Sequence, residues 1–70
     1  MKQGVLVYDK QTDRMDIRFD IDRFFGGLHC EMMLDVFVKN RWIPTRIEYG
    51  NGWYLIGIRS NDLVGLKVRI

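Results

Sequence analysis

The sequence predicts an all-β protein, a small barrel of five or six short strands. Polar and apolar residues alternate with a period of two along most of the chain, as expected where one face of a strand is buried. The pair Asn51-Gly52 stands between two β-rich runs, which is the strongest short-range signal of a β-hairpin. So many strands in only 70 residues must curl to hide their edges, and this favours a barrel.

The first two predicted strands form a hairpin. Residues 4–8 are an apolar run, and the polar segment 9–14 that follows is turn-like. Residues 15–20 alternate between apolar and charged side chains, so one face of this strand is expected to be buried. The segment 20–30 (DIDRFFGGLHC) breaks the alternation and predicts a loop. Three of its apolar side chains are expected to pack onto the body: Phe24, Phe25 and Leu28.

A three-stranded meander and a final strand are predicted next. The meander strands are expected at 32–38, 42–49 and 53–58. Residues 60–65 (SNDLVG) predict one short helical turn, capped by Asn61 or Asp62, before a last strand at 66–70. This order of elements matches an SH3-like barrel. We expect one such domain over residues 1–70.

Cross-strand pairing assigns the meander side chains to two faces, because opposed residues share a face. If Asn51-Gly52 is a two-residue turn, Tyr49 pairs with Tyr54; in the preceding hairpin, Val38 pairs with Arg41. The predicted interior then carries Ile43, Ile47, Tyr49, Tyr54, Ile56 and Ile58. The predicted outer face carries Phe37, Arg41, Trp42, Arg46, Trp53 and Leu55, together with Met33 and Glu48.

The outer face is the candidate binding surface, since Trp and Arg concentrate at interface hot spots. The alternative is that the N-terminal hairpin or the 20–30 loop covers this face, so that its aromatic residues serve only the fold. Three uses remain open if it is exposed. It contacts a protein partner, or it stacks single-stranded nucleic acid beside Arg and Lys, or it is the purely structural interface of a homodimer.

Composition limits the function classes. The net charge of +2 is weakly basic and permits nucleic acid without requiring it. The single cysteine, Cys30, excludes an intramolecular disulfide and favours a reducing compartment. The apolar run at 5–8 is too short for a signal peptide or a membrane span. We therefore expect a cytoplasmic protein with no membrane partner, either a monomer or a homodimer.

Catalytic and metal-binding patterns are weak. His29 and Cys30 are the only pair of catalytic type, and neighbours on a strand would point to opposite faces with no third orienting group. The same two residues are weak zinc candidates, because a structural site favours four ligands rich in Cys and His. The alternative is a purely structural role, in which Cys30 is a small buried hydrophobic residue. Asp13, Asp16, Asp20 and Asp22 are expected at solvated positions. We expect no enzyme and no cofactor.

Several short motifs give the chain a family resemblance. They are Gly-Leu-His-Cys at 27–30, Trp42, Thr-Arg-Ile-Glu at 45–48, Trp-Tyr-Leu at 53–55 and Gly-Leu-Lys-Val-Arg-Ile at 65–70. In this combination the chain resembles a family of short uncharacterised proteins, a domain of unknown function found in Gram-positive bacteria, phages and mobile elements. The chain departs from the pattern at 31–33 and at Asn40, where the family has glycine-containing turns.

The resemblance implies a biological context, mobile DNA, but it implies no activity. It places the protein among small accessory proteins of mobile DNA. A partner would then be a replication, transfer or defence protein. Inhibition of a host nuclease, in the manner of small phage anti-CRISPR proteins, is one special case.

Overall fold

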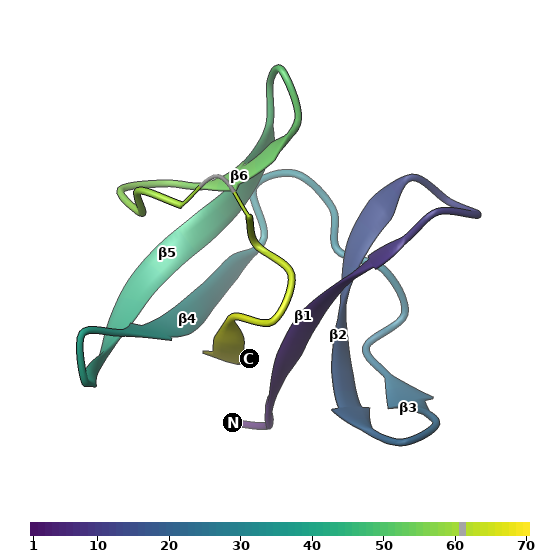
Figure 1. Cartoon of the computed structure of the whole chain (residues 1–70), viewed down its shortest axis with the longest axis horizontal. Helices are drawn as coiled ribbons and strands as arrows, with labels where there is room; N and C mark the ends of the chain where they lie inside the picture. Colours follow the sequence, from purple (N-terminus) through teal and green to yellow (C-terminus); the bar gives the residue numbers. More distant parts are fainter. Residues whose placement is uncertain (61) are drawn as a thin grey trace.

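The computed structural model describes residues 1–60 and 62–70, and it confirms the all-β prediction (Figure 1). In this part of the chain seven antiparallel strands form one open sheet in the order β3-β2-β1-β7-β4-β5-β6. The strands are β1 (Gln3–Asp9), β2 (Arg14–Asp20), β3 (Arg23–Phe24), β4 (Met33–Val38), β5 (Arg41–Tyr49), β6 (Trp53–Leu55) and β7 (Lys67–Arg69). Pairing between the edge strands β3 and β6, which would close a barrel, is absent from the described residues.

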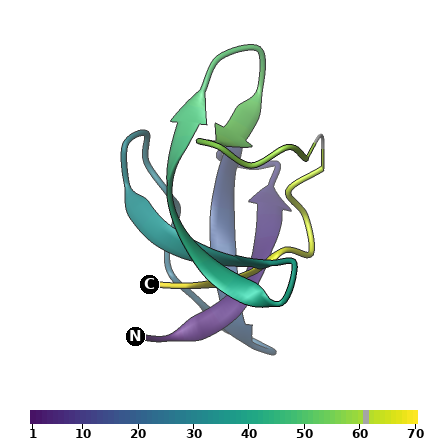
Figure 2. The same ribbon diagram turned by 90° about the vertical axis from the view of Figure 1, so that its left-hand side faces the viewer.

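The last strand, β7, joins the two halves of the sheet. It pairs with β1 through Gln3 and Arg69, and with β4 through Asp35 and Arg69. The two chain ends therefore lie together, with Lys2 N–H donating to the Ile70 carbonyl at 2.8 Å. The β4–β5 hairpin curves across the β1–β2 hairpin, so the halves of the sheet face one another (Figure 2).

The core lies between these two halves. Its buried apolar side chains are Leu6, Met15, Ile17, Leu28, Leu34, Val36, Ile47, Leu55, Leu63 and Val68. The predicted burial of Ile47 and Leu28 is confirmed. The predicted packing of the aromatic pair in the 20–30 loop is wrong, because Phe24 is 51% exposed and Phe25 is also exposed.

The β4–β5 hairpin has the predicted register. Val38 pairs with Arg41, Phe37 with Trp42, and the pairing continues to Met33 and Arg46. The turn residues Lys39 and Asn40 both have positive φ, 51° and 63°, as a type I′ turn requires. Asn40 adopts this conformation because its short polar side chain tolerates the left-handed region better than most residues.

The β5–β6 register differs from the prediction by one residue. Tyr49 pairs with Trp53, and Ile47 pairs with Leu55, so the turn has three residues rather than two. The shift buries Leu55 and exposes Tyr54 and Ile56, and Tyr49 is exposed at the end of β5; all three exposed residues were wrongly expected in the interior. Both alternating sets of this strand are apolar, so the hydrophobic pattern does not distinguish the two registers.

The predicted helical turn before the last strand is wrong for the described residues. Residues 60 and 62–65 form no helix, and one turn hydrogen bond runs from Leu66 N–H to the Leu63 carbonyl at 3.1 Å. Asp62 Oδ1 accepts from Val64 N–H at 3.0 Å, so this carboxylate stabilises a turn instead of capping a helix. The other cap candidate, Asn61, lies outside the described residues.

Asp16 anchors the segment 20–30 and is not the solvated residue that the sequence predicts. The residue is only 7% exposed. One oxygen, Oδ1, accepts from the N–H groups of Ile17, Gly26 and Gly27 at 2.8, 2.9 and 2.9 Å. Two consecutive glycines with φ of 112° and 102° aim both loop amides at the same oxygen. The loop is thereby held against β2.

We expect Asp16→Ala to lower the free energy of unfolding by about 1.5–3 kcal/mol, because three amides lose an ionised acceptor. Asp20→Ala is the matched control, since among residues 1–60 and 62–70 the exposed Asp20 carboxylate accepts only from Ile21 N–H. Urea unfolding followed by fluorescence measures both. Equal losses in the two variants would contradict the anchoring role of Asp16.

Candidate functional site

The candidate site on the outer face of β4 and β5 centres on an aromatic pair. Phe37 and Trp42 are opposed across the two strands, and their ring centroids lie 5.1 Å apart with a tilt of 59°. Both side chains are half-buried. The predicted placement of this pair on a common outer face is therefore confirmed.

Two cations from β7 lie over these rings. The Arg69 guanidinium is 4.4 Å from the Trp42 ring centroid, and the Lys67 ammonium is 5.0 Å from that of Phe37. Arg69 also donates from Nε to Asp35 Oδ2 at 2.9 Å, which fixes the guanidinium over the indole. Such contacts between cations and aromatic faces are favourable.

Sequence reasoning did not assign Lys67 and Arg69 to the site. The available signal was their alternation with Leu66, Val68 and Ile70, which places the two cations on one face of the last strand. Only the sheet order shows that this face continues the outer face of β4.

The other predicted site residues of this hairpin lie farther from the aromatic pair. Arg46 is exposed and pairs with Glu48, Nε to Oε2, at 2.7 Å. Arg41 is exposed beside the β4–β5 turn. Met33 lies two residues before Asp35 on the same face of β4, and it is 72% exposed. The face therefore combines exposed apolar surface with fixed charges.

Trp53 and Leu55 do not lie on this face, so their predicted placement is wrong. Leu55 is 1% exposed and belongs to the core. Trp53 packs against the core and against Tyr49, and its Nε1–H donates to the Asp13 carbonyl at 3.0 Å. The one-residue shift of β6 moves both side chains to the opposite side of the sheet.

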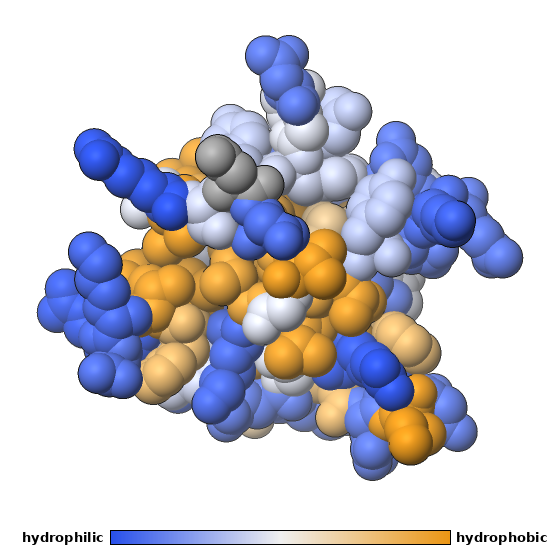
Figure 3. All heavy atoms as spheres, viewed as in Figure 1, coloured by the Kyte–Doolittle hydropathy of each residue, from blue (hydrophilic) through white to orange (hydrophobic). Residues whose placement is uncertain are grey.

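A basic groove lies beside the β4–β5 turn, on the side of the hairpin opposite the aromatic pair. Its volume is about 610 Å³, and Val38, Ile43, Ile58 and Leu66 are its apolar lining residues. Its charged lining residues are Lys39, Arg41 and Arg59, and no Asp or Glu is among the described residues that line it. In Figure 3, apolar side chains on this side of the molecule are bordered by hydrophilic ones. Arg41 pairs with Val38, so it lies on the groove side of the hairpin and its predicted placement on the outer face is wrong.

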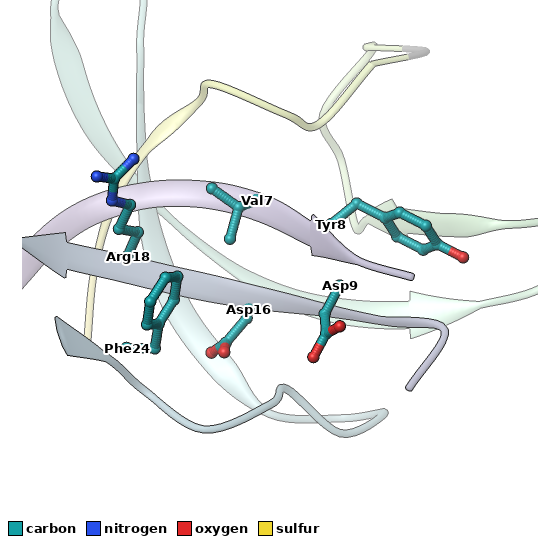
Figure 4. A pocket seen from close by; sticks show the side chains of 6 residues that line it. All are labelled: Val7, Tyr8, Asp9, Asp16, Arg18 and Phe24. Carbon is teal, nitrogen blue, oxygen red and sulfur yellow. The ribbon is translucent and has the colours of Figure 1, made fainter. Parts of the chain in front are cut away.

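A recess of about 560 Å³ lies on the N-terminal half, over β1, β2 and β3 (Figure 4). It is lined by Val7, Tyr8, Asp9, Asp16, Arg18 and Phe24. Its buried carboxylate, Asp16, is held by the loop amides, and Arg18 donates to the carbonyls of Asp20 and Ile21 at 3.1 Å each. Asp16 thus holds the loop after β3, and Arg18 holds the β2–β3 turn.

His29 and Cys30 are both exposed, so the expectation of a buried cysteine is wrong. Within residues 1–60 and 62–70, no group of three or more His, Cys, Asp or Glu side chains is arranged to hold a metal ion. No helix in the same residues has the length and apolar character needed to cross a membrane.

Comparison with known proteins places this geometry in a family. Residues 4–70 match the family described as a domain of unknown function, DUF5348. The chain belongs to this family. The DUF5348 fold is also seen in the crystal structure of a protein from Ruminococcus gnavus, 53% identical, which superposes with a TM-score of 0.91. That match covers 97% of this chain and 99% of the other. No curated protein matches the chain.

The comparison confirms two parts of the resemblance inferred from the sequence motifs. The chain is a DUF5348 domain, and it has a relative in a Gram-positive bacterium. The comparison adds no activity, ligand or partner. Functional inference for this DUF5348 domain therefore rests on its surfaces.

Proposed function

We propose that this protein is a non-enzymatic binding module that contacts a protein partner through the outer face of β4, β5 and β7. The observation that carries the proposal is the aromatic pair Phe37 and Trp42, held between strands and overlaid by Lys67 and Arg69. Rigid aromatic and Arg side chains at the centre of a patch are the usual anchors of an interface. The exposed Met33 extends the apolar area at its edge.

The charges of this face favour an acidic partner. Arg46 and Arg69 are each neutralised by a carboxylate, from Glu48 and Asp35. The basic groove on the other side of the β4–β5 hairpin adds three cations and no carboxylate from its described lining residues. A protein surface that carries Asp or Glu beside apolar side chains would complement both regions.

Single-stranded nucleic acid is the second candidate, and the basic groove favours it. Phosphates bind where Lys and Arg collect without carboxylates. The aromatic pair argues against base stacking, since stacking platforms need open ring faces. Here Arg69 and Lys67 already lie over the two rings. We therefore rank a protein partner first.

We also propose an SH3-like fold and a role as a cytoplasmic accessory protein of a phage or mobile element. An SH3-like arrangement is supported by the curved sheet, with the last strand between β1 and β4, and by the bond from Trp53 to Asp13, which brings the β5–β6 and β1–β2 turns together. A cytoplasmic accessory protein of a phage or mobile element, acting on a replication, transfer or defence protein, agrees with the family resemblance. An anti-CRISPR-like inhibitor is a special case. A homodimer through the same face is the structural alternative.

The proposal is tested with Trp42→Ala, which removes the centre of the patch and leaves the core residues in place. We expect the variant to fold and to lose partner binding by roughly 2 kcal/mol or more, as for an interface anchor. Tagged wild type, Trp42→Ala and the control Ile21→Ala are used in pull-downs from nuclease-treated lysate of a Gram-positive host. Ile21 is an exposed apolar residue in the β2–β3 turn, at the other edge of the sheet.

A discrete protein retained by the wild type and by Ile21→Ala, and lost by a folded Trp42→Ala, is the expected result. Unfolding of Trp42→Ala, or equal capture by all three proteins, would contradict the interface. Binding of oligo(dT) that weakens steeply with salt would favour the nucleic-acid candidate instead. A dimer by sedimentation that Trp42→Ala converts to a monomer would assign the face to self-association.

A further inference from the structure

A second aromatic surface lies between the tips of two hairpins, the β1–β2 turn and the β5–β6 turn. There a groove of about 300 Å³ is lined by the rings of Tyr8, Tyr49 and Trp53. Tyr8 is 46% exposed and Tyr49 is 52% exposed, although both are large aromatic side chains. This groove shares no residue with the outer face of β4, β5 and β7.

Hydrogen bonds and ring contacts hold the aromatic side chains in place. Trp53 Nε1–H donates to the Asp13 carbonyl at 3.0 Å, and the Tyr8 hydroxyl donates to Asp13 Oδ1. The rings of Tyr49 and Trp53 meet edge to face, with centroids 4.9 Å apart. One residue, Asp13, thus positions two of the three rings across the gap between the hairpins. The groove is therefore formed before any ligand binds.

The groove is acidic. Asp13 and Asp62 line it, and no Lys or Arg is among its described lining residues. The hydrogen bond to Asp13 raises the pKa of the Tyr8 phenol above its usual 10.0. The nearby cation Arg14 lines a separate pocket beside Cys30, and it donates to the Leu28 carbonyl.

We propose that this groove accepts a cationic side chain, lysine or arginine, presented by a partner polypeptide. Aromatic faces attract a cation and pack against its aliphatic stem. The Asp13 carboxylate supplies the opposite charge at the rim, where Oδ2 accepts no hydrogen bond from the described residues. Nucleic acid does not fit this site, because two carboxylates repel phosphate. The proposal stands independently of the outer-face proposal.

The test is an NMR titration of the full chain with small probes. The probes are Nα-acetyl-arginine N-methylamide, Nα-acetyl-lysine N-methylamide and the uncharged Nα-acetyl-norleucine N-methylamide, which keeps the aliphatic stem. The readout is the pair of indole Nε1–H resonances, assigned with Trp42→Phe. We expect the cationic probes to shift the Trp53 signal in a saturable way, with little change at Trp42. The norleucine probe should bind several-fold more weakly.

Asp13→Asn is the matched variant. It retains an acceptor for Tyr8 and the backbone carbonyl for Trp53, and Asn tolerates the positive φ of 56° at this position. We expect the affinity for the cationic probes to fall roughly three- to tenfold, as for loss of one charge partner beside aromatic rings. Tyr49→Leu, which removes an exposed ring, provides a second variant if Asp13→Asn does not fold.

Three results would overturn the proposal. The norleucine probe binds as well as the lysine probe, or the cationic probes shift Trp42 and not Trp53, or a folded Asp13→Asn binds them unchanged. Putrescine is included as a free small cation. If it binds more tightly than both amino-acid probes, the occupant is a small polyamine and the polypeptide assignment fails.

Discussion

Leu55→Ala is expected to lower the free energy of unfolding by roughly 2–5 kcal/mol, whereas Ile56→Ala should change it by less than about 1 kcal/mol. Leu55 is fully enclosed opposite Ile47, so its truncation leaves a cavity in the core. Ile56 is 41% exposed, and its N–H still donates to the Arg46 carbonyl after truncation. A loss of several kcal/mol is a large part of the stability of so small a domain.

Chemical denaturation of the two variants beside the wild type measures this difference. The comparison tests the register of β5 and β6 directly, because a two-residue Asn51-Gly52 turn would put Ile56 inside and Leu55 outside. A larger loss for Ile56→Ala than for Leu55→Ala would restore that two-residue turn and return Leu55 to the outer face.

Gly4→Ala is the second change with a large expected effect. A Cβ at this position would lie 2.6 Å from the Arg18 carbonyl oxygen and 2.7 Å from Ile17 Cγ2. The first of these atoms belongs to the backbone of β2, so no side-chain rotation relieves the contact. Strand β1 would have to move away from β2, and we expect a loss of about 3 kcal/mol, at the upper end for overpacking.

Gly50→Ala is the matched control for Gly4→Ala. Its added Cβ would meet Tyr54 Cε1 at 3.5 Å, an ordinary van der Waals contact, and its φ is not in the left-handed region. Thermal unfolding of both variants gives the comparison. A Gly4→Ala protein as stable as Gly50→Ala would show that β1 and β2 are less closely packed at this point.

Half of the candidate site was predictable, because the hydrophobic pattern of the β4–β5 hairpin allows one strand register. In β4 and β5, slipping the register by one residue would bury Asp35 and Arg46, so the placement of Phe37 and Trp42 on the outer face follows. The partners of these rings, Lys67 and Arg69, come from a strand about 30 residues later. Local pattern does not reveal which strands become neighbours in the sheet.

Trp53 shows why the rest was not predictable. Along residues 53–56, Trp53 and Leu55 form one apolar set, and Tyr54 and Ile56 form another, so alternation gives two equivalent solutions. The choice depends on distant contacts. These are the hydrogen bond from Trp53 to the Asp13 carbonyl, the edge-to-face contact with Tyr49 and the burial of Leu55. The same contacts create the second aromatic groove, which sequence reasoning missed.

The all-β class, the approximate strands and the β4–β5 register can be predicted from local pattern, because they depend on alternation and on residues that tolerate turn conformations. Tertiary structure alone decided the β6 register, the burial of Asp16 under the Gly26-Gly27 amides and the position of β7 between β1 and β4. The physical reason is that each of these depends on contacts between segments far apart in the chain, whose energies do not appear in any local pattern.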